Sequence, residues 1–244
     1  MTLRFAISNW AAWAPGLTDQ AAWQHWLRHP SQPEAEAGQP TLSEMPAMMR
    51  RRVERLGRIA LQASYWGLAE QPSCPVVFAS RFGDISRSVD LLQQLAQGET
   101  LSPTAFSMSV HNAIGALFSI ARADPTSYTA IAAGEETVEA AFTEAIGQLA
   151  DGAEAVLVVY YDEPLPAPHQ HFLPNLPDNF PRAWACRLEH AASGGISLEC
   201  APHTDATPPA SRTADIEILH FLLSESTAHL HIAGKRQWRW QKHA

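Results

Sequence analysis

The spacing of apolar and polar positions along the chain predicts strands and helices in alternation. Short apolar segments rich in β-branched residues are typical of buried strands, and they occur at residues 75–80, 127–133 and 153–161. Apolar residues that recur every three or four positions predict helices over residues 46–68, 86–98 and 134–152. Alternation of this kind predicts a layered α/β fold.

Two further stretches are apolar. The first, residues 2–13, predicts a strand that runs into a Trp-rich loop, and the prolines of residues 29–46 indicate an exposed loop after it. The second, residues 106–121, is apolar and rich in small side chains. It predicts a buried helix that begins near Ser107 or Ser109.

The composition changes after Asp162, where prolines become frequent and indicate a linker. The pattern beyond it predicts two strands, a helix and a closing strand pair, at residues 183–191, 196–202, 214–225, 228–234 and 237–243. We therefore expect one unit over residues 1–165, and a Pro-rich linker with a shorter unit over residues 166–244 that packs on the same core.

Charge and cysteine content narrow the classes of protein. The 17 Lys and Arg against 25 Asp and Glu give a net charge of -8, which disfavours nucleic acid and anionic membrane surfaces as partners. The three cysteines, Cys74, Cys186 and Cys200, are too few and too widely spaced for a disulfide framework or a zinc site. The N-terminal segment lacks the apolar run of a signal peptide or membrane span. We expect a cytoplasmic protein.

The sequence offers little for a metal or a cofactor. His169 with His171, and His229 with His231, form His-x-His pairs that can share one face of a strand, but no thiolate or carboxylate accompanies them at ligand spacing. Chance placement explains them better than a metal site. Glycine runs that cradle phosphates and the G-x-S-x-G esterase motif do not occur in the sequence. We expect no metal and no cofactor.

Four blocks of sequence, in this order, carry a resemblance to a known family. They are MPAMMRRRVERLGRIAL, FASRFGDISRSVDLL, SPTAFSMSVHNAIGALFSIA and SYTAIAAGEETVEAAFTEAIGQLADGAEAVLVVYYDEP. Together, over roughly residues 45–165, they resemble the N-terminal half of β-ketoacyl synthases, and most of all the short chain-length-factor proteins of aryl polyene biosynthesis. The resemblance implies a thiolase-like layered α/β fold, the N-terminal half of a ketosynthase, with a short C-terminal α+β extension.

The resemblance also locates the position of the family's nucleophile. In β-ketoacyl synthases a strand turns sharply into a buried helix whose start presents a cysteine, and the helix dipole lowers the thiol pKa. Here that position falls at Ala132, Ala133, Gly134 or Glu135, with no cysteine among them. The family's two histidine motifs are also absent from residues 166–244. The resemblance therefore implies a subunit without catalytic activity of its own.

Such a subunit would form a heterodimer with a full-length ketosynthase and shape its acyl tunnel, in aryl polyene or fatty-acid-type biosynthesis. Thiolase-fold proteins pair through the strand that corresponds here to residues 127–132. The residues expected at the interface or at the end of the tunnel are Phe106, Met108, His111, Phe118 and Tyr128.

Three adjacent arginines are candidates for contact with an acyl carrier protein, which would reach the chain through the complex. Arg50, Arg51 and Arg52 present guanidinium groups that suit carboxylate and phosphate partners. The simpler interpretation, which we favour, is a solvated helix face whose arginines pair with Glu44 and Glu54.

Two other functions remain open at this point. Some ketosynthase relatives act only as decarboxylases, so the carboxylates Glu135 and Glu136 at the helix start raise the possibility of an independent malonyl decarboxylase or acyltransferase that uses an unrecognised residue. Both glutamates also suit the positive end of a helix dipole, which explains them without catalysis. The third function is a homodimeric scaffold that recruits carrier protein.

Overall fold

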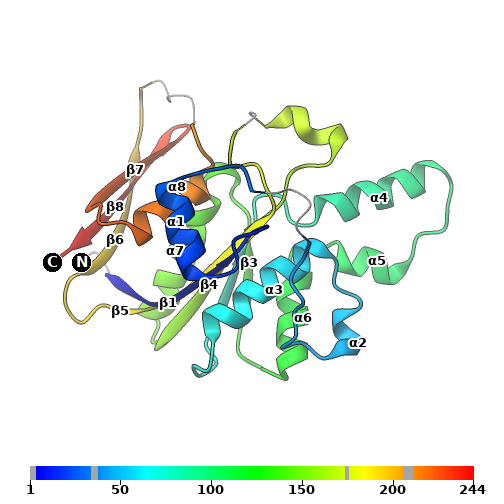
Figure 1. Cartoon of the computed structure of the whole chain (residues 1–244), viewed down its shortest axis with the longest axis horizontal. Helices are drawn as coiled ribbons and strands as arrows, with labels where there is room; N and C mark the ends of the chain where they lie inside the picture. The colour runs from blue at the N-terminus through cyan, green and yellow to red at the C-terminus, as the bar shows by residue number, and fades with distance from the viewer. Residues whose placement is uncertain (1–3, 34–37, 174–175, 206–210) are drawn as a thin grey trace.

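The computed structural model describes residues 4–33, 38–173, 176–205 and 211–244, and in this part of the chain it contains one eight-stranded sheet (Figure 1). Parts of three expected segments, residues 2–3, 34–37 and 174–175, lie outside the described residues. The strands are β1 (Phe5–Trp13), β2 (Val76–Ala79), β3 (Tyr128–Ile131), β4 (Ala155–Asp162), β5 (Arg182–His190), β6 (Gly195–Pro202), β7 (Ala228–Ala233) and β8 (Arg236–His243).

Helices cover both faces of this sheet. The helices and 3₁₀ turns are α1 (Gln20–Arg28), α2 (Ala47–Arg50), α3 (Arg55–Leu68), α4 (Ile85–Ala96), α5 (Pro103–Met108), α6 (Ala113–Arg122), η1 (Gly134–Glu136), α7 (Thr137–Ala150), η2 (Ala167–Phe172) and α8 (Ala214–Leu223). Among the helices of the described ranges, none is long and apolar enough to cross a membrane.

The strand order is β3-β2-β4-β5-β1-β6-β8-β7. β2 pairs in parallel with β3 and with β4, whereas every pairing from β4–β5 to β7–β8 is antiparallel. The helical connections that follow β2 and β3 explain this division, because parallel neighbours need a crossover and antiparallel neighbours do not. The mixed sheet with helices on both faces confirms the predicted layered α/β fold.

Two apolar clusters fill the space between the sheet and its helices, and β4 shows how one strand serves both. Val156, Val158 and Tyr160 belong to the cluster that also contains residues of α1, α7 and α8. Leu157, Val159 and Tyr161 alternate with them and belong to the cluster with α3 and α6. Because successive side chains of a strand point to opposite faces, a continuous apolar run is the pattern of a strand buried on both sides.

The C-terminal segments contribute to the first of these clusters. Trp240 of β8 is fully buried and contacts Phe142 of α7 edge-on, with 4.9 Å between ring centroids. Ile216 and Leu219 of α8 are also fully buried in the same cluster. Figure 1 shows α8 beside α7 and α1 over this face of the sheet.

The helix predicted over residues 46–68 is wrong in one respect, because the structure divides it into α2 and α3. The side chain of Arg58 donates hydrogen bonds to the carbonyls of Arg50 and Val53, at 2.9 and 3.0 Å, and so helps to satisfy the carbonyls where α2 ends. Val53, in the break, is 5% exposed and lies against Gly57 of α3.

The helix predicted over residues 106–121 is likewise two helices, α5 and α6, with Ser109–Asn112 between them. Side chains in the break bond to backbone groups and compete with helix continuation. Ser109 Oγ donates to the Phe106 carbonyl at 2.8 Å, and His111 Nε2 donates to the Ser80 carbonyl at 3.0 Å.

The predicted Trp-rich loop also contains an unforeseen helix, α1. Its N-cap is Asp19, whose carboxylate accepts a hydrogen bond from the Ala22 N–H at 2.8 Å. Trp23 and Trp26 lie one turn apart on this helix and are buried in the first cluster.

Candidate functional site

A cleft of about 560 Å³ opens at the carboxyl ends of the parallel strands. Its floor is formed by the residues directly after β2 and by the end of β4. Its walls are formed by η1 with the start of α7, the start of α8, β7, and the side chains of Leu173, Leu176 and Asn179. The crossovers that follow β2 and β3 run on opposite faces of the sheet, because α6 packs in one apolar cluster and α7 in the other. In open α/β sheets, such a change of face is where ligand crevices form.

Asp162, at the end of β4, is the centre of the polar floor. Its carboxylate accepts hydrogen bonds from Ser80 Oγ at 2.8 Å, Tyr160 OH at 2.5 Å and the Arg81 N–H at 3.2 Å. Burial raises the pKa of Asp162 although these hydrogen bonds act in the opposite direction. Burial also raises the pKa of Tyr160 well above its usual value, so this hydroxyl is held in its protonated form.

Arg182 joins the floor to the start of α8. Its guanidinium makes a bidentate ion pair with Asp215, at 2.7 and 2.5 Å, and also donates to the hydroxyl of Thr213 at 3.0 Å. Two further bonds go to the carbonyls of Asp178 and Phe180, at 2.9 and 3.0 Å. All donors of this buried arginine are occupied, so it positions three chain segments and has no donor left for a reacting group.

The strand-to-helix corner that the family resemblance singles out lies on the rim of the same cleft. Ala132 and Ala133 follow β3, and Gly134 and Glu135 form the first residues of η1. The one hydroxyl nearby belongs to Thr137, which is 2% exposed. Its Oγ1 donates to the Gly134 carbonyl at 2.7 Å and accepts from the Ala133 N–H at 3.0 Å. The corner therefore holds no thiol, and its hydroxyl is committed to the backbone.

The carboxylate of Glu136, which the sequence left open as a catalytic group, is bound to the C-terminal strands. It accepts hydrogen bonds from Arg236 Nε at 2.6 Å and from Trp238 Nε1 at 2.8 Å, both on β8. Although burial opposes the change, these bonds lower the pKa of Glu136. Glu136 is therefore an ionised structural anchor.

The five residues expected at an interface or at the end of the tunnel lie in different parts of the structure. Phe118 is 4% exposed and packs edge-on against Tyr65 and Phe78, so it lies in the core. Tyr128, on the edge strand β3, is half-buried and covers Gly115 of α6. The remaining three lie on α5 or in the break after it. Phe106 is 62% exposed, and Met108 and His111 are half-buried.

Phe106 belongs to a surface that we call the apolar arm, formed by Leu92 and Leu95 of α4, Phe106 of α5 and Val110. These large apolar side chains are between 46% and 63% exposed. Figure 1 shows α4 and α5 projecting side by side, away from the strands β6, β7 and β8. An apolar surface of this kind indicates a site of protein contact.

The three candidate docking arginines lie at the end of α2 and directly after it. Arg51 and Arg52 are exposed, whereas Arg50 is half-buried and donates to the Leu42 carbonyl at 3.1 Å. The simpler interpretation paired these arginines with Glu44 and Glu54. Glu54 instead pairs with Arg87 at 2.8 Å, and Glu44 accepts a hydrogen bond from Gln62 at 2.9 Å.

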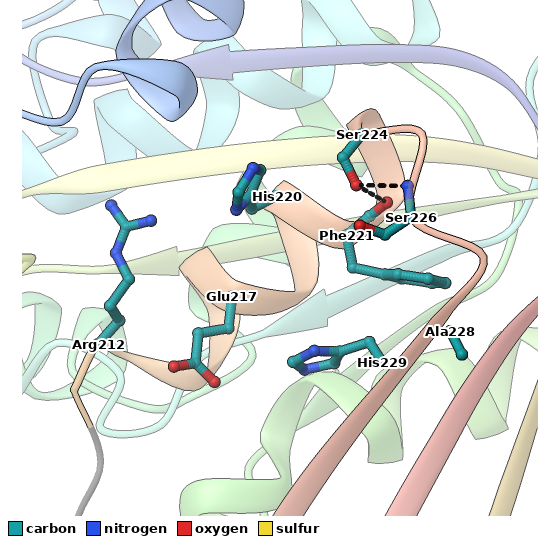
Figure 2. Close-up of a pocket in the computed structure, with 8 residues that line it drawn as sticks. All are labelled: Arg212, Glu217, His220, Phe221, Ser224, Ser226, Ala228 and His229. Carbon is teal, nitrogen blue, oxygen red and sulfur yellow. Dashed lines mark hydrogen bonds between the residues drawn. The ribbon is translucent and has the colours of Figure 1, made fainter.

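A second, smaller cleft of about 290 Å³ lies between α8 and β7 (Figure 2). The ring of His229 on β7 stacks on that of Phe221 on α8, with 5.9 Å between ring centroids. Glu217 extends from α8 as well. Burial lowers the pKa of both His220 and His229, which favours their neutral forms. Within the ranges that the structure describes, no group of three His, Cys, Asp or Glu residues is arranged to hold a metal ion.

Comparison with known proteins places the chain in a family. The family model for the beta-ketoacyl synthase N-terminal domain matches residues 23–241. The chain belongs to this family. The match extends on both sides of the segment that the sequence blocks indicated, and its C-terminal part includes β5, β6, β7 and most of β8. No curated protein matches the chain.

Solved structures with this fold include a ketosynthase (ApeO) in complex with its chain length factor (ApeC) from Xenorhabdus doucetiae. The match has a TM-score of 0.85 and 27% identity, and covers 98% of this chain and 99% of that one. The ishigamide ketosynthase/chain length factor matches with a TM-score of 0.64 and 16% identity, over 82% and 67% of the two chains. A complex of an acyl-carrier protein with its ketosynthase, AntDE:AntF, matches with a TM-score of 0.60 and 12% identity, over 83% of this chain and 71% of that one. The chain therefore has the thiolase-like fold of the ketosynthases.

The sequence analysis did not predict the cleft, although the positions of its floor residues in the sequence indicate a polar site. Asp162 ends an apolar strand, Arg182 begins another, and Asp215 lies in the first turn of an apolar helix. Charged residues at the ends of otherwise apolar elements indicate buried ion pairs or a polar site, because an unpaired charge there would be costly.

Proposed function

We propose that this chain is a non-catalytic, ketosynthase-like subunit, a chain-length factor, that pairs with an active β-ketoacyl synthase. The observation that carries the proposal is the strand-to-helix corner at Ala132–Glu135. A ketosynthase needs a nucleophile there, and this corner offers methyl groups, a glycine and an exposed carboxylate. Beside it, the Glu136 side chain is bound to β8, and the Thr137 hydroxyl is bound to backbone groups of the corner itself.

The edge strand β3 is the segment that we assign to the partner. In a parallel pair, the N–H and C=O of one residue point to the same neighbour. The carbonyls of Ser127 and Ile131 accept from β2, at 3.1 Å each, so the backbone groups of Tyr128 and Ala130 point to the open edge. Antiparallel addition of the ketosynthase's own edge strand would satisfy them and continue the sheet across the heterodimer.

The apolar arm would complete the interface and reach the partner's acyl tunnel. α4 and α5 belong to neither apolar cluster of this chain, so the arm has apolar side chains to spare for another protein. Phe106 is the most suitable residue to end the tunnel, because its ring is large and 62% exposed. Met108 and His111 lie beside it and would support it. Phe118 would act indirectly, because its ring packs α6 against Tyr65 of α3 and Phe78 of β2.

We further propose that the complex makes aryl polyene or other fatty-acid-type chains and receives them from an acyl carrier protein. Arg51 and Arg52, which are exposed, would contribute to carrier-protein docking. The likeness to the complex of ApeO with its chain length factor supports the pairing with a ketosynthase. This proposal also includes two expectations from the sequence, a ketosynthase-like unit over residues 1–165 followed by a C-terminal extension over residues 166–244, and a cytoplasmic location.

Co-expression with a full-length ketosynthase from the same organism tests the proposal. We expect the two chains to co-purify, and the complex, but not the isolated chain, to elongate a starter with malonyl carrier protein. A matched sample in which the partner's nucleophilic cysteine is replaced by alanine should lose all elongation. Bicarbonate release or stable acylation by the isolated chain would contradict the proposal and favour an independent decarboxylase or acyltransferase.

A further inference from the structure

The cleft at the carboxyl ends of the parallel strands has several large apolar side chains in its lining. Its apolar lining residues are Phe82, Val138, Leu173, Leu176, Leu230 and Ile232. Leu230 and Ile232 are two residues apart on β7 and therefore lie on the same face of that strand. A volume of about 560 Å³ with such a lining is within the range of sites for small molecules.

The arginines that line the cleft are each matched by a carboxylate of the chain. Arg182 is bound to Asp215 in the floor. Arg212 donates to both carboxylate oxygens of Asp178, at 3.1 and 3.3 Å. Arg81 lies 3.6 Å from Glu135 at the rim. His231 also lines the cleft and is bound to Glu139. These four groups therefore leave little positive charge for an anionic guest.

Three further lining carboxylates, Asp162, Glu163 and Glu217, accept hydrogen bonds from neutral hydroxyls. The donors are Ser80 and Tyr160 for Asp162, Ser86 for Glu163 and Ser211 for Glu217. Burial raises the pKa of all three carboxyl groups. The positive charges that oppose it, Arg182 at Asp162, Arg55 at Glu163 and His231 with Arg212 at Glu217, each lower the pKa by less than burial raises it. The lining therefore has an excess of carboxylates that are short of positive charge.

Two helix N-termini also open on the cleft, those of α7 and α8, and a helix N-terminus by itself favours anions. Each is already compensated by acidic residues. Glu135, Glu136 and Glu139 lie in η1 or the first turn of α7, and Asp215 and Glu217 lie in the first turn of α8. A carboxylate or phosphate entering the cleft would therefore meet like charge.

We propose that this cleft binds a small amphipathic amine, with its apolar body against Leu230, Ile232 and the other apolar side chains and its cationic nitrogen at the lining carboxylates, which include Glu163 and Glu217. Two observations carry the proposal together. The lining carboxylates select a cationic head group, and the apolar lining selects a ligand with a hydrocarbon body. The proposal is independent of the proposed pairing with a ketosynthase, which uses β3 and the apolar arm.

Three probes of equal chain length separate the possible head groups. We expect calorimetric titration of the full chain, in the complex with its partner where co-purification gives one, to show decylamine binding at one site per chain. Decanol should bind about tenfold more weakly, because it lacks the charge, and decanoate more weakly still. The same titrations with Glu163→Gln plus Glu217→Gln should reduce decylamine affinity about tenfold and leave decanol affinity unchanged.

The matched control is Glu225→Gln, an exposed carboxylate on the turn after α8 that does not line the cleft, and it should bind all three probes as the unmodified chain does. A second variant, Leu230→Ala at a 47% exposed position, should weaken decylamine and decanol alike. Equal affinity for the three probes, or decylamine binding that the Glu163 and Glu217 changes leave intact, would overturn the proposal. The latter result would indicate non-specific attraction to an acidic protein surface.

Discussion

His231 Nδ1 on β7 lies 2.5 Å from Glu139 Oε1 on α7, although 92 residues separate the two in sequence. The Glu139 side chain is fully buried, and that of His231 is 11% exposed. Together with the bonds from Arg236 and Trp238 to Glu136, this contact ties the start of α7 to the β7–β8 hairpin. The helix that presents a nucleophile in catalytic relatives is here an anchor for the C-terminal strands.

Replacement of His231 should make stability depend less on pH. Burial disfavours its charged form, but the hydrogen bond and the charge of Glu139 overcome burial and raise the pKa of His231 above 6.5. The folded chain therefore holds this proton more tightly than the unfolded chain. The contribution is complete below the unfolded pKa and is lost as pH rises through the folded pKa.

The measurement is the free energy of urea unfolding for the unmodified chain and for His231→Asn at several pH values. The stability difference between the two should be largest near pH 6 and shrink toward about pH 9. His231→Phe should cost about 1–3 kcal/mol near pH 6, because it leaves a buried carboxylate without its donor. A difference that stays constant with pH would show that folding leaves the pKa of His231 unchanged.

The same substitution at two helical glycines should have opposite effects. A Cβ at Gly115 of α6 would lie 2.5 Å from Cδ2 of Tyr128, so Gly115→Ala should destabilise the chain by about 1–3 kcal/mol. A Cβ at Gly147 of α7 would meet nothing within 4 Å, so Gly147→Ala should stabilise it by about 0.5–1 kcal/mol. Thermal and urea unfolding measure both. Equal effects at the two sites would mean that α6 does not approach β3 this closely.

Phe106→Ala should lengthen the products of the complex if this ring ends the acyl tunnel. The matched control is Phe172→Ala on η2, whose ring is 67% exposed but lies outside the apolar arm, and it should leave product length unchanged. Product masses from the elongation assay decide between them. Phe118→Ala should instead cost about 3–5 kcal/mol of stability, because it opens a cavity in the core. Unchanged products from Phe106→Ala would remove the gate role from Phe106.

Ala130→Pro should abolish the complex while the chain itself stays folded. The substitution removes an N–H that points away from β2, so it blocks strand addition at the edge without breaking a β2–β3 hydrogen bond. Far-UV circular dichroism checks folding, and size-exclusion chromatography with the ketosynthase measures pairing. Ala130→Ser, which keeps the N–H, should pair normally. Normal pairing of the proline variant would exclude β3 as the shared edge.

The local pattern of apolar and polar residues was sufficient to predict most of the strands and helices. The unbroken apolar run of β4 predicted a strand buried on both faces, and the periodicity of residues 214–225 predicted α8. These predictions succeeded because the period of a strand or a helix is set by neighbouring residues. The predictions failed at Ser109–Asn112 and at Arg51–Glu54, where side chains satisfy backbone groups and divide a helix whose apolar pattern continues.

The sequence by itself determined the alternation of strands and helices, the ketosynthase resemblance and the lack of a cysteine at the corner. Only the tertiary structure decided the order of the strands, the division of the glutamates into an exposed Glu135 and a clamped Glu136, and the cleft between α7, α8 and β7. The physical reason is distance along the chain. Glu136 meets Trp238 across 102 residues, and the burial and hydrogen bonds that such contacts create exist only once the whole sheet has formed.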